Sequence, residues 1–396
     1  MEDKIYLDNA ATTRCHEDVL KEMIPYFTDV YGNASSLHTM GQEARKIIEN
    51  ARAKIAKYLN ANPNEIIFTG SGTESDNIAI LGTARKLKSR GNHLITSNIE
   101  HPAVRNTFHH LQREGFEITE VPISPNGTIS VKDVEDAIRP ETIFISIMYA
   151  NNEIGSIQPI EEIAKLADDR DIIFHTDAVQ ALGKLRIDLK NSHIHLLSAS
   201  AHKIMGPKGV GLLYFKNKCR HPKLGKFLEP ITYGGGHEGG YRSATENVPG
   251  IVGFAKATEI AYNDLEAEQT REKKIRDDFI SWVLANIPES YLNGSQENRL
   301  ANNINFGFRY IEGESLLLYL NDEGFEVSTG SACSSHSLEP SHVLLALGLE
   351  KSEAHGSLRI TLGRDIKQAE MDKLKPVLKR VVETLRELSP LTPKNR

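Results

Sequence analysis

Apolar and polar positions follow two alternating rhythms along residues 36–215. Stretches with apolar side chains three or four positions apart predict amphipathic helices, and short apolar runs between them predict buried strands. The helical stretches are 44–59, 71–88, 103–114 and 159–167, and the strand-like runs are 66–68, 94–96, 142–148, 172–174 and 194–197. This alternation predicts an α/β fold with a mostly parallel central sheet and helices on both faces. Functional residues are then expected where strands end and helices begin.

The rest of the chain predicts a smaller α+β domain. A Gly-rich loop at 230–242 precedes one long helical stretch from 247 to about 286, which we expect to link two domains. Short elements follow, with strands at 304–306, 325–328 and 358–361 and helices at 315–320, 341–347 and 367–388. We therefore predict a large domain over 14–255 and a small domain made of 1–13 and 256–396, which carries a loop at about 328–340.

Length and charge narrow the class of protein. The 396 residues are enough for about two domains. A net charge of −6 gives no reason to expect nucleic acid or an anionic membrane as a partner. The first residues, MEDK, have neither the basic nor the apolar region of a signal peptide, and no apolar run reaches membrane-spanning length. These features predict a cytoplasmic protein.

The chain has three cysteines, and one of them stands in an unusual setting. Cys15, Cys219 and Cys333 are far apart and odd in number, which argues against a disulfide framework and against a CxxC metal site, so no metal is predicted. Small and polar residues surround Cys333 on a predicted loop, whereas a buried structural cysteine would have apolar neighbours. Cys333 is therefore a candidate nucleophile, and Cys15 and Cys219 are not.

Two predicted strands end in residues that a pyridoxal phosphate (PLP) enzyme needs. Asp177 follows the run 172–174, and Lys203 follows the run 194–197. A lysine amine forms a Schiff base with the PLP aldehyde, and an aspartate pairs with the pyridine nitrogen so that the ring acts as an electron sink. The alternative is a surface lysine and a helix-capping aspartate.

Four further segments carry candidate binding groups. The segment 69–77 follows a strand and opens a helix, as a phosphate site does, although an ordinary helix cap would look the same. His101 stands after a strand, where it either stacks on a planar ring or faces solvent. In the segment 151–155, the Asn152 amide either binds the phenolic oxygen of the cofactor or a substrate carboxylate, or it belongs to a plain turn. Arg359 lies inside an apolar strand and needs an anion, which is either a substrate carboxylate or an internal salt bridge.

Together these motifs resemble the NifS/IscS family of cysteine desulfurases, within the class-V aminotransferase-like, fold-type I (aspartate aminotransferase-like) PLP enzymes. The resemblance runs nearly end to end. It is carried by 6–13 (YLDNAATT), 31–38 (YGNASSLH), 100–101 (EH), 175–180 (HTDAVQ), 202–203 (HK), 242–245 (RSAT), 330–333 (GSAC) and 338–344 (LEPSHVL).

The resemblance implies a set of residue roles. Lys203 would hold PLP, Asp177 would pair with the pyridine nitrogen, Gln180 would contact the phenolic oxygen, and His101 would stack on the ring and assist proton transfer. The implied phosphate ligands are Thr73, Ser200 and His202, with Thr245 from the other subunit of a homodimer. Asn152 and Arg359, with Asn33 nearby, would hold the carboxylate of L-cysteine. Cys333 would take the sulfur as a persulfide and pass it to an acceptor such as an IscU- or NifU-like iron–sulfur scaffold.

Three positions depart from the family pattern, and rival functions stay open. Ala34, Gly72 and Ala201 stand where many relatives have Pro, Ala and Gly. None of them removes a functional group, but they bear on the packing around the phosphate loop. A selenocysteine lyase or related PLP lyase is the nearest alternative. A non-catalytic iron–sulfur assembly platform, with Cys333 as a transient cluster ligand, is the alternative from a different class.

Overall fold

The computed structural model describes residues 4–218, 220–329 and 339–392. Within these residues, a seven-stranded sheet has the order β2-β8-β7-β6-β5-β3-β4. Neighbours pair in parallel from β7 to β4, and β8 is antiparallel to both β7 and β2. The strands are β2 (Ile66–Thr69), β3 (His93–Ser97), β4 (Glu117–Val121), β5 (Thr142–Ser146), β6 (Ile173–Asp177), β7 (Leu196–Ser200) and β8 (Gly211–Phe215). The predicted α/β class is confirmed.

The sheet is buried on both faces because neighbouring residues of each strand point into different cores. Ile173 and Leu196 belong to one hydrophobic cluster, whereas Phe174 and Leu197 belong to another. Helices α4 (Gly72–Leu87) and α5 (Pro102–Arg113) supply the first cluster, and α3 (Thr39–Tyr58), α7 (Ile160–Asp168) and α8 (Val248–Asn263) supply the second. A strand buried on both faces needs consecutive apolar residues, and this requirement explains the apolar runs in the sequence.

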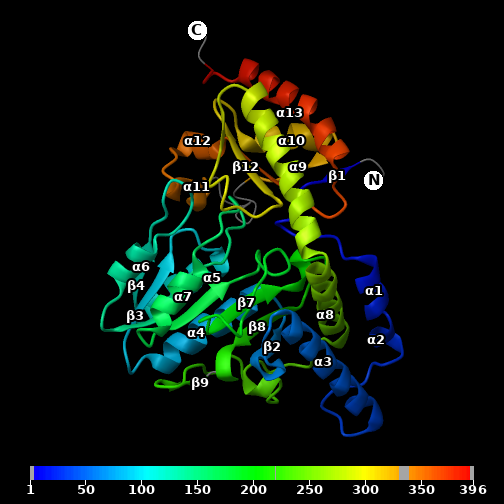
Figure 1. Cartoon of the computed structure of the whole chain (residues 1–396), viewed down its shortest axis with the longest axis vertical. Coiled ribbons are helices and arrows are strands. Elements are labelled where there is room, and N and C mark those ends of the chain that lie inside the picture. The colour runs from blue at the N-terminus through cyan, green and yellow to red at the C-terminus, as the bar shows by residue number, and fades with distance from the viewer. Residues whose placement is uncertain (1–3, 219, 330–338, 393–396) are drawn as a thin grey trace.

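A second sheet builds the other end of the molecule. Its strands β11 (Ser290–Leu292), β12 (Asn303–Phe308) and β14 (Ser357–Thr361) pair antiparallel in that order. They pack with α9 (Leu265–Asn286), α10 (Gly313–Asp322) and α13 (Gln368–Leu388) in a separate core, which also takes in Leu7. Strand β1 (Ile5–Tyr6) pairs in parallel with β13 (Phe325–Glu326), so the N-terminal segment lies beside C-terminal elements (Figure 1). The exact domain boundaries stay a prediction.

The prediction of one continuous helix from 247 to about 286 is wrong. The chain forms two helices, α8 and α9, that meet at Asp264, whose φ of −104° and ψ of 5° are not helical. The side chains of α8 pack in the core of the large sheet, and those of α9 pack in the core of the second sheet. Figure 1 shows α9 rising from the end of α8 toward the second sheet. The break lets each helix face its own core.

Several short elements were not expected from the sequence. They include α1 (Glu17–Met23), α2 (Pro25–Thr28), α6 (Val131–Ala137), α12 (Lys351–His355), β9 (Arg220–His221), β10 (Gly225–Lys226), and the 3-10 turns η1 (Pro63–Glu65), η2 (Ala201–Lys203), η3 (Lys216–Lys218) and η4 (Glu238–Gly240). The helix predicted at 341–347 is present as α11 (His342–Ala346). Among the described residues, no helix combines the length and apolar character needed to cross a membrane.

Candidate active site

The ends of β6 and β7 and the start of α4 meet at one point. Asp177, the last residue of β6, lies opposite Ser198 of β7 in the parallel register. A Cβ atom on Gly72 would lie 2.7 Å from Val179 Cγ2 and 3.6 Å from Ser200 Cβ. Glycine at position 72 therefore lets the first turn of α4 approach both strand ends closely. Three of the predicted cofactor-binding motifs are thus side by side.

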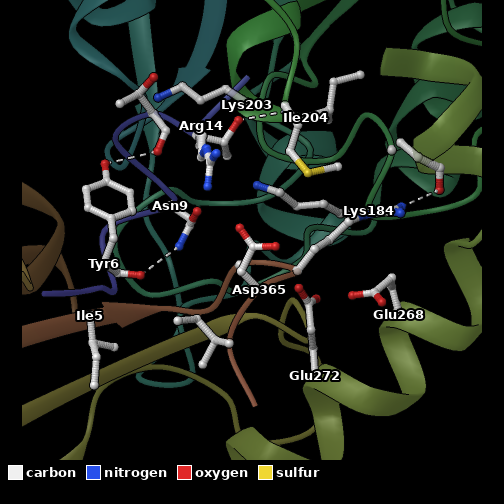
Figure 2. Close-up of a pocket in the computed structure, with 18 of the residues that line it drawn as sticks. Ile5, Tyr6, Asn9, Arg14, Lys184, Lys203, Ile204, Glu268, Glu272 and Asp365 are labelled. Atoms are coloured by element: carbon white, nitrogen blue, oxygen red, sulfur yellow. Dashed lines mark hydrogen bonds between the residues drawn. The ribbon is translucent and has the colours of Figure 1, made fainter. Parts of the chain in front are cut away.

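Lys203 lies directly after β7, on the turn η2. Its Nζ donates hydrogen bonds of 2.7 Å to the carbonyl oxygens of Ala10 and Ala11. Lys203 also lines a cavity of about 1150 Å³, into which Lys184, Glu272 and other charged side chains reach from several segments (Figure 2). The lysine is therefore held by the N-terminal segment at the edge of a large cavity.

Asp177 is a buried carboxyl group beside the lysine. Its Oδ1 accepts a hydrogen bond of 2.9 Å from the Val179 amide. Burial raises the pKa of Asp177 to about 6, while the Val179 amide and the Lys203 cation act in the opposite direction. Asp76, a buried carboxyl group that the sequence analysis missed, lies close enough for the two to interact, and burial also raises its pKa. A buried carboxylate of this kind is stabilised by a cationic partner.

His101 and Thr73 line the same cavity. His101 caps α5, with its Nδ1 accepting a hydrogen bond of 3.1 Å from the Ala103 amide. Burial and the Lys203 cation lower the pKa of His101 to about 4, so the ring is neutral near pH 7 and carries its proton on Nε2. Both His101 and Thr73 line a cavity of about 460 Å³. The solvent-facing alternative for His101 is therefore disfavoured.

Two of the predicted phosphate ligands, Thr73 and Ser200, lie at the start of α4. Ser71 caps this helix through a hydrogen bond of 3.0 Å from the Glu74 amide to its Oγ, which leaves the earlier amides of the first turn available. Thr73 is exposed there, and Ser200 is buried at the end of β7. His202 Nδ1 lies 3.1 Å from Thr12 Oγ1. A helix N-terminus with nearby hydroxyl groups suits a phosphate.

Arg359 makes the internal ion pair that the sequence left as one of two options. Its Nη2 donates a hydrogen bond of 2.7 Å to Asp8 Oδ1, and its Nη1 donates one of 3.2 Å to the carbonyl oxygen of Asn152. The guanidinium is almost wholly buried, and its Nε has no hydrogen-bond partner among the described residues. Asn152 and Arg359 are thus adjacent, as a carboxylate site requires, and one buried donor remains open.

The N-terminal segment 8–13 connects the site, and sequence reasoning assigned it no role. Asp8 binds Arg359, and the carbonyl of Ala10 accepts from both Gln180 and Lys203. The signal was available, since Asp8 and Ala10 both fall in the 6–13 motif. The motif was used only to support the family resemblance, because nothing local indicates what its backbone contacts.

Three predicted site residues are not brought to this point by described contacts. Asn33 is exposed, and its Oδ1 accepts a hydrogen bond of 2.8 Å from the amide of Ser35. Thr245 is also exposed, beyond the Gly-rich loop. Cys333 lies outside the described residues, as does Cys219. Cys15 is partly buried and unpaired, and burial raises the pKa of its thiol, which does not favour a nucleophile.

One cluster of possible metal ligands lies elsewhere, at Asp168, His195 and His221. The Nδ1 atoms of the two rings accept from the backbone amides of Phe174, at 3.1 Å, and Lys223, at 3.3 Å. A neutral ring then carries its proton on Nε2, the atom that faces Asp168. A bound metal would need the Nε2 lone pair, so the arrangement favours a hydrogen-bonded cluster.

Glu100, beside His101, is a buried acid to which the sequence analysis assigned no role. Its Oε1 accepts from Ser97 Oγ and from the Met148 amide, and Oε2 has no partner among the described residues. Burial raises its pKa to about 8, so this group is protonated near pH 7.

Glu100→Gln is expected to remove part of the pH dependence of stability. The folded-state pKa of Glu100 lies above the unfolded value of about 4.3, so the folded protein holds an extra proton between these values. The free energy of unfolding therefore falls as the pH rises through this window. Urea unfolding should show the variant gaining about 4 kcal/mol over the parent between pH 5 and pH 9. The exposed Glu141→Gln serves as control, and a parent and Glu100→Gln that respond alike to pH would contradict the assignment.

Comparison with known proteins identifies the family. The model for "Aminotransferase class-V" matches residues 5–374. The chain belongs to this family. The cysteine desulfurase IscS of Dictyoglomus turgidum is 49% identical over 98% of this chain and 97% of that protein, which places the chain with the NifS/IscS cysteine desulfurases of the class-V family. A solved NifS-like protein superposes with a TM-score of 0.88 at 36% identity, covering 96% of this chain and 99% of that one. The structure titled "SspA in complex with cysteine" superposes with a TM-score of 0.79 at 39% identity, over 90% and 98% of the two chains.

Class-V aminotransferases are PLP-dependent, and the residues present fit this cofactor. Asp177 supplies a buried carboxylate at a strand end, and Lys203 supplies an amine within its electrostatic reach. Because Gly72 has no side chain, the N-terminus of α4 can lie close to the strand ends and to Ser200. In chemistry, the Asp177 carboxyl group matches the pyridine nitrogen of PLP, and the Lys203 amine matches its aldehyde. The N-terminus of α4 matches its phosphate.

Proposed function

We propose that this protein is a PLP-dependent cysteine desulfurase, which converts L-cysteine to L-alanine and holds the sulfur as a persulfide on Cys333. The observation that carries the proposal is the convergence of Lys203, Asp177 and His101 on one strand-end site, with the Asn152–Arg359 pair supported by the same N-terminal segment. An iron–sulfur platform without catalysis would not need the first three groups.

The cofactor residues have distinct tasks in this proposal. PLP, when bound, supplies an electron sink that weakens bonds around the substrate's α-carbon. Asp177 would hold the pyridine nitrogen, Gln180 the phenolic oxygen, and Thr73, Ser200 and His202 the phosphate. Lys203 Nζ would hold the cofactor aldehyde, and the same amine would take the Cα proton of the substrate. His101, neutral near pH 7, would stack on the ring and move protons through Nε2.

Substrate binding and sulfur transfer use other residues. Arg359 and Asn152 would bind the cysteine carboxylate, with Arg359 Nε as the open donor and Asn33 as a further proposed contact. The Cys333 thiolate attacks the substrate sulfur, so that an S–S bond forms and the Cβ–S bond breaks. The electron pair of the broken bond stays with the substrate carbon, which takes a proton and leaves as alanine.

The assembly and the acceptor complete the proposal. We infer a homodimer in which Thr245 reaches the phosphate site of the other subunit, since Thr245 is exposed in the single chain. Large apolar side chains are also exposed on α1, on α2 and in the segment that follows, namely Leu20, Ile24, Phe27, Tyr31 and Leu37. An IscU- or NifU-like iron–sulfur scaffold in the cytoplasm is the proposed sulfur acceptor.

The direct test is product analysis. Purified, PLP-loaded protein with L-cysteine and a thiol reductant is expected to form alanine and sulfide in equal amounts. Selenocysteine in a parallel reaction separates desulfurase from selenocysteine lyase activity. PLP-loaded protein that turns over selenocysteine but gives no alanine from cysteine would refute the proposed substrate.

A further inference from the structure

The Gln180 side chain is held from two sides. Its Nε2 donates a hydrogen bond of 2.9 Å to the Ala10 carbonyl, the same oxygen that accepts from Lys203 at 2.7 Å. Its Oε1 accepts a hydrogen bond of 2.8 Å from Lys184 Nζ. Lys184 and Lys203 both line the large cavity (Figure 2). A continuous chain of hydrogen bonds thus runs from Lys184 through Gln180 and Ala10 to Lys203.

These partners fix which end of the amide is oxygen. An ammonium group only donates, so the atom of Gln180 that faces Lys184 is the oxygen. A carbonyl only accepts, so the atom that faces Ala10 is the nitrogen. A flipped amide would place two acceptors together at Ala10 and two donors together at Lys184. The side chain is buried, so water cannot relieve either conflict.

We propose that Lys184 is a positioning residue for the cofactor, because it orients the Gln180 amide so that its N–H groups are available to the phenolic oxygen of PLP. This inference rests on the role of Gln180 in the proposed function. Lys184 acts through Gln180 and touches neither the substrate nor the reacting atoms.

Because of the charges around Lys184, we expect its control of the Gln180 amide to depend on pH. The charged groups that act on Lys184 or line the same cavity come from several elements. They are Lys203 after β7, Arg359 on β14, Glu268 and Glu272 on α9, Glu370 and Lys373 on α13, Glu326 on β13, and Lys4, Arg14, Lys208, Arg364 and Asp365. Burial, and then the Lys203 cation, lower the pKa of Lys184 to about 7, and Glu272 opposes them. Above this pH the neutral amine also accepts hydrogen bonds, so it no longer enforces one orientation of the amide.

Three substitutions at position 184 separate orientation from packing. Lys184→Arg keeps a donor-only group and is expected to bind PLP within about twofold of the parent. Lys184→Met removes the donor and should weaken PLP binding about fivefold. Lys184→Glu presents an acceptor to Oε1, so that neither orientation satisfies both neighbours, and should weaken binding about fiftyfold. The measurement is equilibrium PLP binding by the apoprotein, followed by the visible absorbance of the bound cofactor. Above pH 7, the parent should lose affinity relative to Lys184→Arg.

A double-mutant cycle with Gln180→Ala gives the decisive result. If Lys184 acts through the amide, Lys184→Met should have no further effect on PLP affinity once Gln180 is alanine. Lys373 lines the same cavity as Lys184, so Lys373→Met is the matched control and should bind PLP like the parent. An equal effect of Lys184→Met in both backgrounds would overturn the inference. So would parental affinity in both Lys184→Met and Lys184→Glu. Parental affinity in Gln180→Ala would instead refute the role of Gln180, and with it the inference. If Lys184→Glu does not fold by circular dichroism, the Met and Arg variants carry the test.

Discussion

Lys203→Ala is expected to abolish the visible absorbance of bound PLP and to lower alanine formation from cysteine by at least about a thousandfold. The reason is that one amine performs two tasks, binding the cofactor and moving the Cα proton. No other described lysine is placed at the end of β7 beside Asp177. Absorbance spectra of the purified variant and an alanine assay measure the two losses separately.

The control for this variant is Lys208→Ala. Lys208 follows five residues later in the chain and is exposed, so its loss should leave both the spectrum and the turnover unchanged. A Lys203→Ala protein with the parental spectrum after dialysis would show that another amine binds the cofactor. That result would contradict the site as described.

Cys333→Ala is expected to keep the PLP spectrum and cysteine binding while sulfide release falls to background. The cofactor groups come from the strand ends, whereas Cys333 enters the proposal only as the group that accepts sulfur. A cysteine-induced spectral change without sulfide is therefore the expected signature. Cys15→Ala is the matched control and should turn over normally, since the Cys15 thiol lies partly buried beside the His16 carbonyl. Normal sulfide release from Cys333→Ala would remove Cys333 from the mechanism.

The sequence predicts the central sheet well because its signals are local. The apolar runs that end at Asp177 and before Lys203 became β6 and β7, and a strand buried on both faces leaves such a run in any sequence. The meeting of these strand ends also followed from the sequence, because parallel strands place their carboxyl ends at one edge of the sheet.

The parts that were missed depend on contacts between distant residues. Asp8 and Arg359 are 351 positions apart, and neither segment indicates the other as its partner. The break at Asp264 arises because α8 and α9 pack on different cores, which the helical periodicity of 247–286 does not reveal. Strand β8 was missed because it follows β7 after a short Gly/Pro turn and runs antiparallel to it, so no helix separates the two strands as it does in the rest of the pattern.

The most direct test of the central claim is a single turnover with L-cysteine, followed by mass analysis of the peptide that contains Cys333. The account predicts one added sulfur atom on Cys333 and an equimolar amount of alanine, both absent from Lys203→Ala. Alanine formed in the same reaction while Cys333 stays unmodified and the sulfur leaves directly as sulfide would contradict the persulfide mechanism.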